Sequence, residues 1–311
     1  MGFELPYPDL AQERQGNTGT PGVWHFDSGV PGPTLMITSL IHGNELCGAW
    51  ALKTLLASGL RPERGGLILA FCNLDGYDSF DLQHTDASRF VDEDLNRVWQ
   101  DDRLAQGSNR ERRRAAELLL WVRRADHLLD LHSMHEPGKP LLLTGLLPRN
   151  IELARKLKAP EHVIADAGHK DGVRLRDYGR FGDPRDTACA LLIECGYHGD
   201  PASRQVALDM TARMLREFRV VATGSIPQEW FLPEPSAQRV LQVTDAVVAP
   251  SMDVSFARDW EGLETLGEAG TVIGWADGRP ITTPYDNCTL IMPSLKQLRP
   301  GVTVLRLAKD Y

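Results

Sequence analysis

Short apolar runs alternate with segments of helical period along residues 33–219, and this alternation restricts the chain to few architectures. The apolar runs lie at 33–41, 66–73, 127–133, 140–145 and 187–196. The segments of helical period lie at 45–59, 109–125, 148–159 and 201–220. Strands that are apolar on both faces and alternate with helices are typical of a sheet covered on both sides. The sequence therefore predicts an α/β fold, with a mostly parallel or mixed sheet covered by helices.

The pattern changes near residue 222. Residues 223–237 contain three prolines and no periodicity, which indicates a linker. Beyond it, short apolar segments are separated by Gly, Pro and Asp turns, which predicts strands. We therefore expect a large α/β domain over 1–222 and a small all-β domain over 238–311.

Charge and composition exclude several classes of partner. The formal net charge of −8 argues against nucleic acid, because phosphate binding needs concentrated positive charge. The N-terminal residues lack the features of a secretory signal, and no apolar run approaches the roughly 18 residues that span a bilayer. The five cysteines form no close pairs, which indicates buried free thiols in a reducing compartment. We expect a cytoplasmic protein without membrane or nucleic-acid partners.

Three side chains that can bind a metal follow two of the predicted strands. His42 and Glu45 come directly after the first strand, and His132 closes the strand at 127–133. Because the carboxyl ends of parallel strands meet in one crevice, these residues are expected to converge. Two histidines and a glutamate are a ligand set of catalytic zinc. The alternative is a hydrogen-bonded core histidine beside a carboxylate at a helix N-terminus. Asp130 is either a partner of His132 or a simple strand-end carboxylate.

Two further groups accompany these residues. Glu194 ends an apolar strand, where burial raises a carboxyl pKa towards the range of a general acid–base, unless the group serves a buried salt bridge. Arg89, Asn96 and Arg97 lie in a segment with little periodicity. They suit a substrate carboxylate and a developing oxyanion, although loop arginines commonly only pair with nearby acids.

Four motifs carry a family resemblance. In chain order they are HGNE at 42–45, SRFVDEDLNR at 88–97, DLHS at 130–133 and IECG at 193–196. Together they resemble the succinylglutamate desuccinylase/aspartoacylase family, whose members are zinc amidohydrolases on the zinc-carboxypeptidase fold. The resemblance implies one zinc ion per chain, held by His42, Glu45 and His132.

The same resemblance implies roles for other residues. Glu194 would be the general base and then the acid, and Arg89 would stabilise the oxyanion. Asn96 and Arg97 would bind a substrate carboxylate. A further arginine is expected before the strand that carries Glu194, and the candidates are Arg174, Arg176, Arg180 and Arg185. Tyr285, in the C-terminal segment, is a candidate substrate-binding residue.

The expected function is hydrolysis of the amide of a small, anionic N-acyl amino acid by zinc-activated water, with a glutamate as general base. The first alternative is a metallocarboxypeptidase acting on short peptides, which would share the fold and the metal. The second is a non-catalytic relative that binds a metal or another ligand. Homo-oligomer formation stays open.

Overall fold

The computed structural model of the protein describes residues 2–168, 171–222 and 224–311. Among these residues, eleven strands form one sheet. In spatial order they are β1 (Val23–Asp27), β3 (Gly66–Phe71), β2 (Thr34–Ser39), β4 (His127–Met134), β7 (Cys189–Tyr197), β5 (Leu141–Leu143), β6 (His162–Ala165), β8 (Arg239–Val248), β14 (Thr303–Asp310), β13 (Cys288–Ile291) and β10 (Thr265–Leu266). A three-stranded antiparallel sheet contains β12 (Arg279–Thr282), β11 (Val272–Ala276) and β9 (Val254–Phe256).

The large sheet is mixed. Strands β3, β2, β4 and β7 are parallel neighbours, and so are β5, β6 and β8. Strand β5 runs antiparallel to β7, and the C-terminal strands β8, β14, β13 and β10 are antiparallel to one another. The predicted fold class is confirmed: a mixed sheet with helices and a small antiparallel sheet near the C-terminus.

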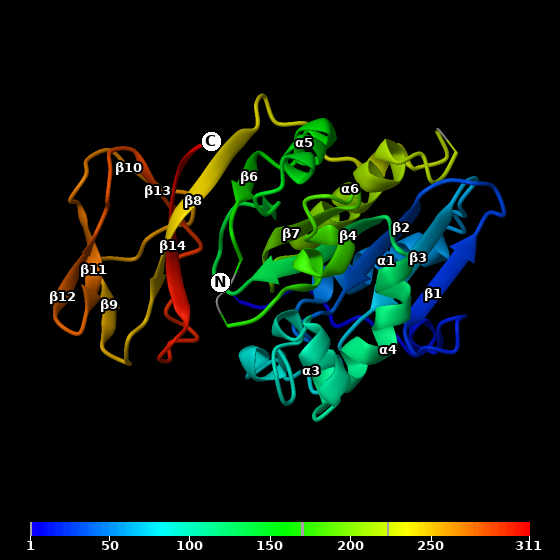
Figure 1. The fold of residues 1–311 in the computed structure, drawn as a ribbon, viewed down its shortest axis with the longest axis horizontal. Coiled ribbons are helices and arrows are strands. Elements are labelled where there is room, and N and C mark those ends of the chain that lie inside the picture. The colour runs from blue at the N-terminus through cyan, green and yellow to red at the C-terminus, as the bar shows by residue number, and fades with distance from the viewer. Residues whose placement is uncertain (1, 169–170, 223) are drawn as a thin grey trace.

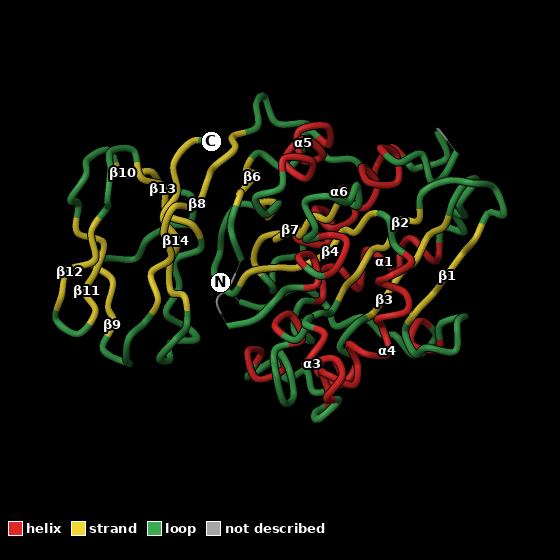
Figure 2. Tube along the Cα trace, viewed as in Figure 1, coloured by secondary structure: helices red, strands yellow, loops and turns green. Residues whose placement is uncertain are grey.

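Helices cover both faces of the first half of this sheet (Figure 2). They are α1 (Leu46–Ala57), α2 (Leu74–Asp78), α3 (Asp101–Gln106), α4 (Arg110–Arg124), α5 (Pro148–Leu157) and α6 (Ala202–Glu217). Successive side chains of a strand point to opposite faces. On β2, Leu35 and Ile37 join the core beneath α1, α5 and α6, whereas Met36 joins the core beneath α4. This two-sided burial explains the uninterrupted apolar runs of the sequence.

Most predicted elements are present with small shifts of their ends. The predicted helices correspond to α1, α4, α5 and α6. Strands β1 and β6 were not predicted, because β1 is a partly exposed edge strand and β6 has four residues. His132 does not close its strand, because Ser133 and Met134 continue β4.

The C-terminal strands extend the main sheet (Figure 1). Strand β8 pairs with β6 on one side and with β14 on the other, so the sheet continues past the predicted linker. The first linker residue, 223, lies outside the described residues. Within the remainder of the linker, Trp230 is buried and the carbonyl of Leu232 accepts a hydrogen bond from Arg213 of α6 at 2.8 Å. The domain boundaries remain a prediction from the sequence. Among the described helices, none has both the length and the hydropathy to cross a membrane.

Candidate active site

A sharp turn between β2 and α1 presents His42 and Glu45. Leu40 has a φ of 54°, a left-handed conformation that non-glycine residues seldom adopt, and it bends the chain away from the strand. A Cβ on Gly43 would lie 2.1 Å from the backbone of Gly76, so only glycine fits between these two segments. Glu45 occupies the N-cap position of α1. The turn therefore fixes both side chains at the carboxyl end of the sheet.

His42, Glu45 and His132 converge on one point. Glu45 Oε1 lies 2.7 Å from His42 Nδ1, and Glu45 Oε2 lies 2.8 Å from His132 Nδ1. One donor atom from each residue lies within 4.8 Å of the others, and all three side chains are buried. Burial opposes a charged Glu45, yet the two histidines hold its pKa well below the usual value. Glu45 therefore stays ionised, and a carboxylate with two imidazoles is a donor set that fits a metal cation.

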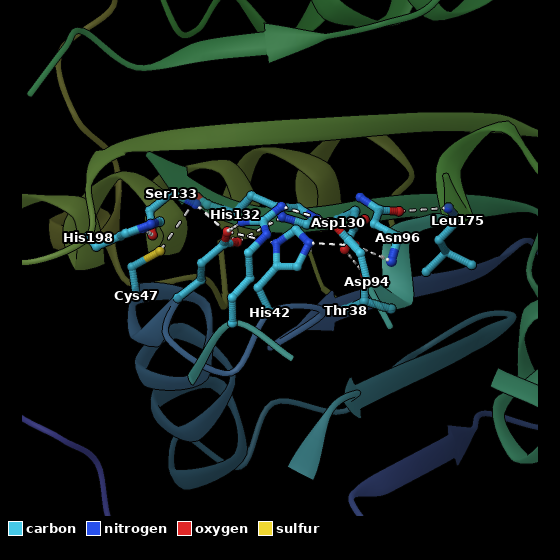
Figure 3. A network of polar contacts seen from close by, with 12 residues as sticks. Thr38, His42, Cys47, Asp94, Asn96, Asp130, His132, Ser133, Leu175 and His198 are labelled. Atoms are coloured by element: carbon cyan, nitrogen blue, oxygen red, sulfur yellow. Dashed lines mark hydrogen bonds and ion pairs between the residues drawn. The ribbon is translucent and has the colours of Figure 1, made fainter. Parts of the chain in front are cut away.

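Two aspartates orient the histidines from outside this cluster (Figure 3). His42 Nε2 lies 3.0 Å from Asp94 Oδ1, and His132 Nε2 lies 2.8 Å from Asp130 Oδ2. Thr38 Oγ1 donates to the other oxygen of Asp130 at 2.6 Å. In each ring, the carboxylate beside Nε2 directs the lone pair of Nδ1 towards the point where the histidines and Glu45 converge, as in metal centres. Asp130 thus takes the position of a partner to His132.

Glu194 lies on β7, directly opposite His132 on β4. Its side chain is buried, and its Oε2 has no hydrogen-bond partner in the described protein. Burial, and then the charge of Glu45, raise the pKa of Glu194 to about 8, while His132 and Arg89 act in the opposite direction. A buried carboxyl group with this pKa can accept and return a proton near neutral pH.

The segment 89–97 brings three predicted residues to the same crevice. Arg89 lies 3.3 Å from both Glu45 Oε1 and Asp94 Oδ2. Arg97 donates to the carbonyl of Asn96 at 2.8 Å and also lines the crevice. Asn96 is buried at its wall, and its Oδ1 accepts the backbone N–H of Leu175 at 2.9 Å, which ties the segment to the neighbouring loop.

Of the four candidate arginines before β7, Arg174 lines the crevice. Its guanidinium bonds Asp166 at 2.8 and 3.1 Å and Asp177 at 2.7 Å, so it is firmly held. The other three donate elsewhere: Arg176 to the carbonyl of Thr144, Arg180 to Asp126 and Asp186, and Arg185 to Asp183.

Tyr285 lies away from these residues. Its hydroxyl is 2.6 Å from Thr244 Oγ1, and its ring packs on the C-terminal core. It does not belong to the described lining of the crevice, so we do not carry it into the proposed site.

The crevice has a volume of about 430 Å³. One wall is built by residues of the C-terminal segment between Met292 and Arg306. Arg306 of β14 projects to the same side as Arg174, and its Nε lies 3.8 Å from Asp166 Oδ2. Neither Arg306 nor Asp94 was expected from the sequence. Asp94 lies within the SRFVDEDLNR motif and could have been weighed there, whereas nothing near Arg306 in the chain signals its position.

Comparison with known proteins supports the sequence interpretation. Residues 31–167 match the family model described as "Succinylglutamate desuccinylase/Aspartoacylase catalytic domain". The predicted resemblance to this family is confirmed. Among curated proteins, no sequence matches the chain significantly.

Solved structures share the fold over nearly the whole chain. A succinylglutamate desuccinylase/aspartoacylase from Rhodobacter sphaeroides is 19% identical, with 91% of this chain and 87% of that chain covered and a TM-score of 0.66. Succinylglutamate desuccinylase from Vibrio cholerae is 16% identical, with coverages of 93% and 86% and a TM-score of 0.66. The product-bound ectoine utilization protein EutE from Ruegeria pomeroyi is 15% identical, with coverages of 89% and 85% and a TM-score of 0.62. At sequence identities this low, these comparisons show that the fold is shared and do not show a shared activity.

Proposed function

We propose that this protein is a zinc-dependent amidohydrolase that cleaves the amide of a small N-acyl amino acid. One observation carries the proposal: a buried carboxylate with an unpartnered oxygen, Glu194, faces three convergent metal-binding side chains from the adjacent strand and turn. The match to the desuccinylase/aspartoacylase catalytic domain supports the same reaction class.

His42, Glu45 and His132 would hold the zinc ion. When bound, zinc lowers the pKa of water and polarises a carbonyl group. Glu194 takes the proton of the attacking water and later gives it to the leaving amine. The Arg89 guanidinium lies beside Glu45, one of the proposed zinc ligands. From there it donates a hydrogen bond to the oxygen of the scissile carbonyl as negative charge develops on that oxygen.

The positive groups of the crevice suit an anionic substrate. Arg97 and Arg306 both line the crevice although they are far apart in the sequence, and Asn96 lies beside Arg97. We assign to Asn96 and Arg97 the binding of a substrate carboxylate, which a guanidinium can hold with two parallel hydrogen bonds. The C-terminal segment, predicted as a unit over 238–311, restricts the crevice to small substrates because it supplies one wall.

The test combines a substrate panel with one variant. N-acetyl, N-succinyl and N-formyl amino acids and short peptides are offered to the zinc-loaded protein, and release of free amine is measured. Glu194→Gln keeps the shape of the side chain, so it should retain zinc and lose about 100-fold or more in turnover. Cleavage of peptides alone would favour a carboxypeptidase. Stoichiometric zinc without turnover of any substrate would indicate a non-catalytic relative.

The contribution of the C-terminal wall is tested separately. Arg306→Met keeps the length of the side chain without its charge, so KM for an anionic substrate should rise while kcat changes little. Arg239→Met, on the neighbouring strand β8, is the matched control, because Arg239 bonds Asp310 and does not belong to the described lining. Equal KM values for both variants would contradict the assignment.

A further inference from the structure

A second group of metal-binding side chains lies beside the active site and takes no part in the proposed reaction. Asp86 comes from a 3₁₀ turn at Thr85–Ser88, His135 from the loop after β4, and His198 from the loop after β7. One donor atom of each residue lies within 4.8 Å of the others. His135 Nδ1 is at the centre, 2.8 Å from Asp86 Oδ1 and 3.3 Å from His198 Nε2.

The three facing atoms, one each from Asp86, His135 and His198, have too few protons to form a hydrogen bond at each contact. The other ring nitrogen of His198, Nδ1, lies 2.8 Å from Ser133 Oγ (Figure 3). If Nδ1 donates to Ser133, then His198 Nε2 carries a lone pair, and one proton on His135 must serve both this lone pair and Asp86. If Ser133 donates instead, His198 donates to His135, and Asp86 faces a nitrogen that has no proton for it. In the first tautomer two acceptors share one proton, and in the second Asp86, which is exposed, has only solvent as a donor. A cation at this point would bind all three facing atoms directly.

We propose that Asp86, His135 and His198 bind one divalent transition-metal ion, separate from the ion held by His42, Glu45 and His132. Two imidazoles and a carboxylate suit Zn²⁺, Co²⁺ and related ions. His198 is buried and oriented by Ser133, which supplies the outer-shell hydrogen bond that metal-binding histidines normally have. Asp86 is 43% exposed, so the ion can enter from solvent and keep water on its remaining positions.

This site is weaker than the first because it is more exposed: Asp86 is exposed, whereas all the side chains of the first site are buried. Two cations also lie near it. Arg89 Nη1 lies 3.5 Å from His135 Nε2, and Lys296 Nζ donates to the carbonyl of His135 at 2.6 Å. Both cations have acidic partners: Arg89 has Glu45, and Lys296 has Glu136 at 3.1 Å. We therefore expect the second ion to bind after the first and to leave first on dialysis.

Equilibrium dialysis of the full-length protein against Zn²⁺, and against Co²⁺ followed by its visible absorption, tests the second site. The wild type should bind two equivalents, and Asp86→Asn and His135→Gln should each bind one. The matched control is His84→Gln. His84 forms an equally short contact, 2.8 Å, with Asp81, but the pair is exposed and belongs to neither group of metal-binding side chains in the described residues. This variant should retain two equivalents.

A third variant separates the two sites. His132→Ala should lose the ion of the first site and keep an ion that Asp86→Asn loses. Saturation of the wild type at one equivalent, or two equivalents in both Asp86→Asn and His135→Gln, would overturn the second site. If the single equivalent then disappears in His132→Ala, the proposed function stands while the second site fails. If it persists there and disappears in Asp86→Asn, the zinc assignment behind the proposed function fails.

Discussion

Glu111 offers a way to disturb the arginine-bearing segment 89–97 without changing a group of the crevice. The residue lies in the first turn of α4 and is 1% exposed. Its Oε1 accepts the backbone N–H of Val91 at 2.7 Å, and its Oε2 accepts those of Asp92 and Glu93 at 3.1 Å each. A single carboxylate therefore anchors the backbone between Arg89 and Asn96, and we predict that Glu111→Gln weakens both the fold and the catalysis.

The size of the effect follows from the number of donors. Asn73 Nδ2 also donates to Oε1, at 3.2 Å, so each oxygen of Glu111 accepts two hydrogen bonds. In Glu111→Gln, one side-chain oxygen remains as the amide oxygen. The other is replaced by an amide NH2 group, which cannot accept the two hydrogen bonds that this oxygen accepted. Two charge-assisted hydrogen bonds are lost, at about 1.5–3 kcal/mol each. We expect the free energy of unfolding to fall by about 3 kcal/mol and kcat/KM to fall at least about tenfold, the equivalent of about 1.4 kcal/mol.

Urea unfolding at fixed zinc concentration and steady-state kinetics measure the two effects. Glu117→Gln is the control on the same helix. Glu117 is 54% exposed and bonds Arg114, so its replacement should change stability by less than about 0.5 kcal/mol. Equal stability and equal kcat/KM for the two variants would refute the anchoring role of Glu111.

Three further predictions concern other groups. Arg89→Ala should mainly lower kcat, because the oxyanion charge exists in the transition state. Arg97→Ala should mainly raise KM, because the substrate carboxylate is already present in the ground state. Equal small effects of the two variants would contradict both roles. Asp94→Asn should weaken zinc binding about 10–100-fold in a chelator competition, since Asp94 orients a metal-binding histidine; unchanged affinity would exclude that role. Burial lowers the pKa of His127 from 6.5 to about 4, so from pH 6.5 downwards the unfolded chain binds a proton that the folded chain does not. The wild type should thereby lose about 3 kcal/mol of stability between pH 6.5 and 4, and His127→Phe should lack this loss in urea titrations; parallel pH curves would disprove it.

The central residues could be predicted because strand order and chemistry agree. His42 follows a strand that is apolar on both faces, and His132 and Glu194 lie near the ends of two others. These strands are parallel neighbours whose ends meet. A histidine or a glutamate at such a place has few structural reasons to be there. The convergence of these side chains therefore follows from local patterns alone.

Other parts of the site depend on pairings between distant strands. Arg306 reaches the crevice because β14 pairs with β8 and β8 with β6, and no local pattern in the sequence specifies that order. His135 and His198 meet because β4 and β7 are adjacent and a bulge follows His132. The position of Tyr285 illustrates the converse: it was a candidate only because it lies in the C-terminal segment, and the structure turns its hydroxyl towards Thr244.

The position of β14 within the large sheet has a consequence for biosynthesis. Although it follows all the other described strands along the chain, β14 lies between β8 and β13 and not at an edge. On the ribosome, β1 to β7 can assemble early, with the proposed zinc ligands and Glu194 already in place. The wall that contains Arg306 can form only after residue 310 has left the exit tunnel. During that interval the nascent chain exposes the unpaired edge of β8, which is open to pairing with other chains. Premature termination within β14 would therefore yield a protein that has the proposed catalytic groups but is prone to aggregate.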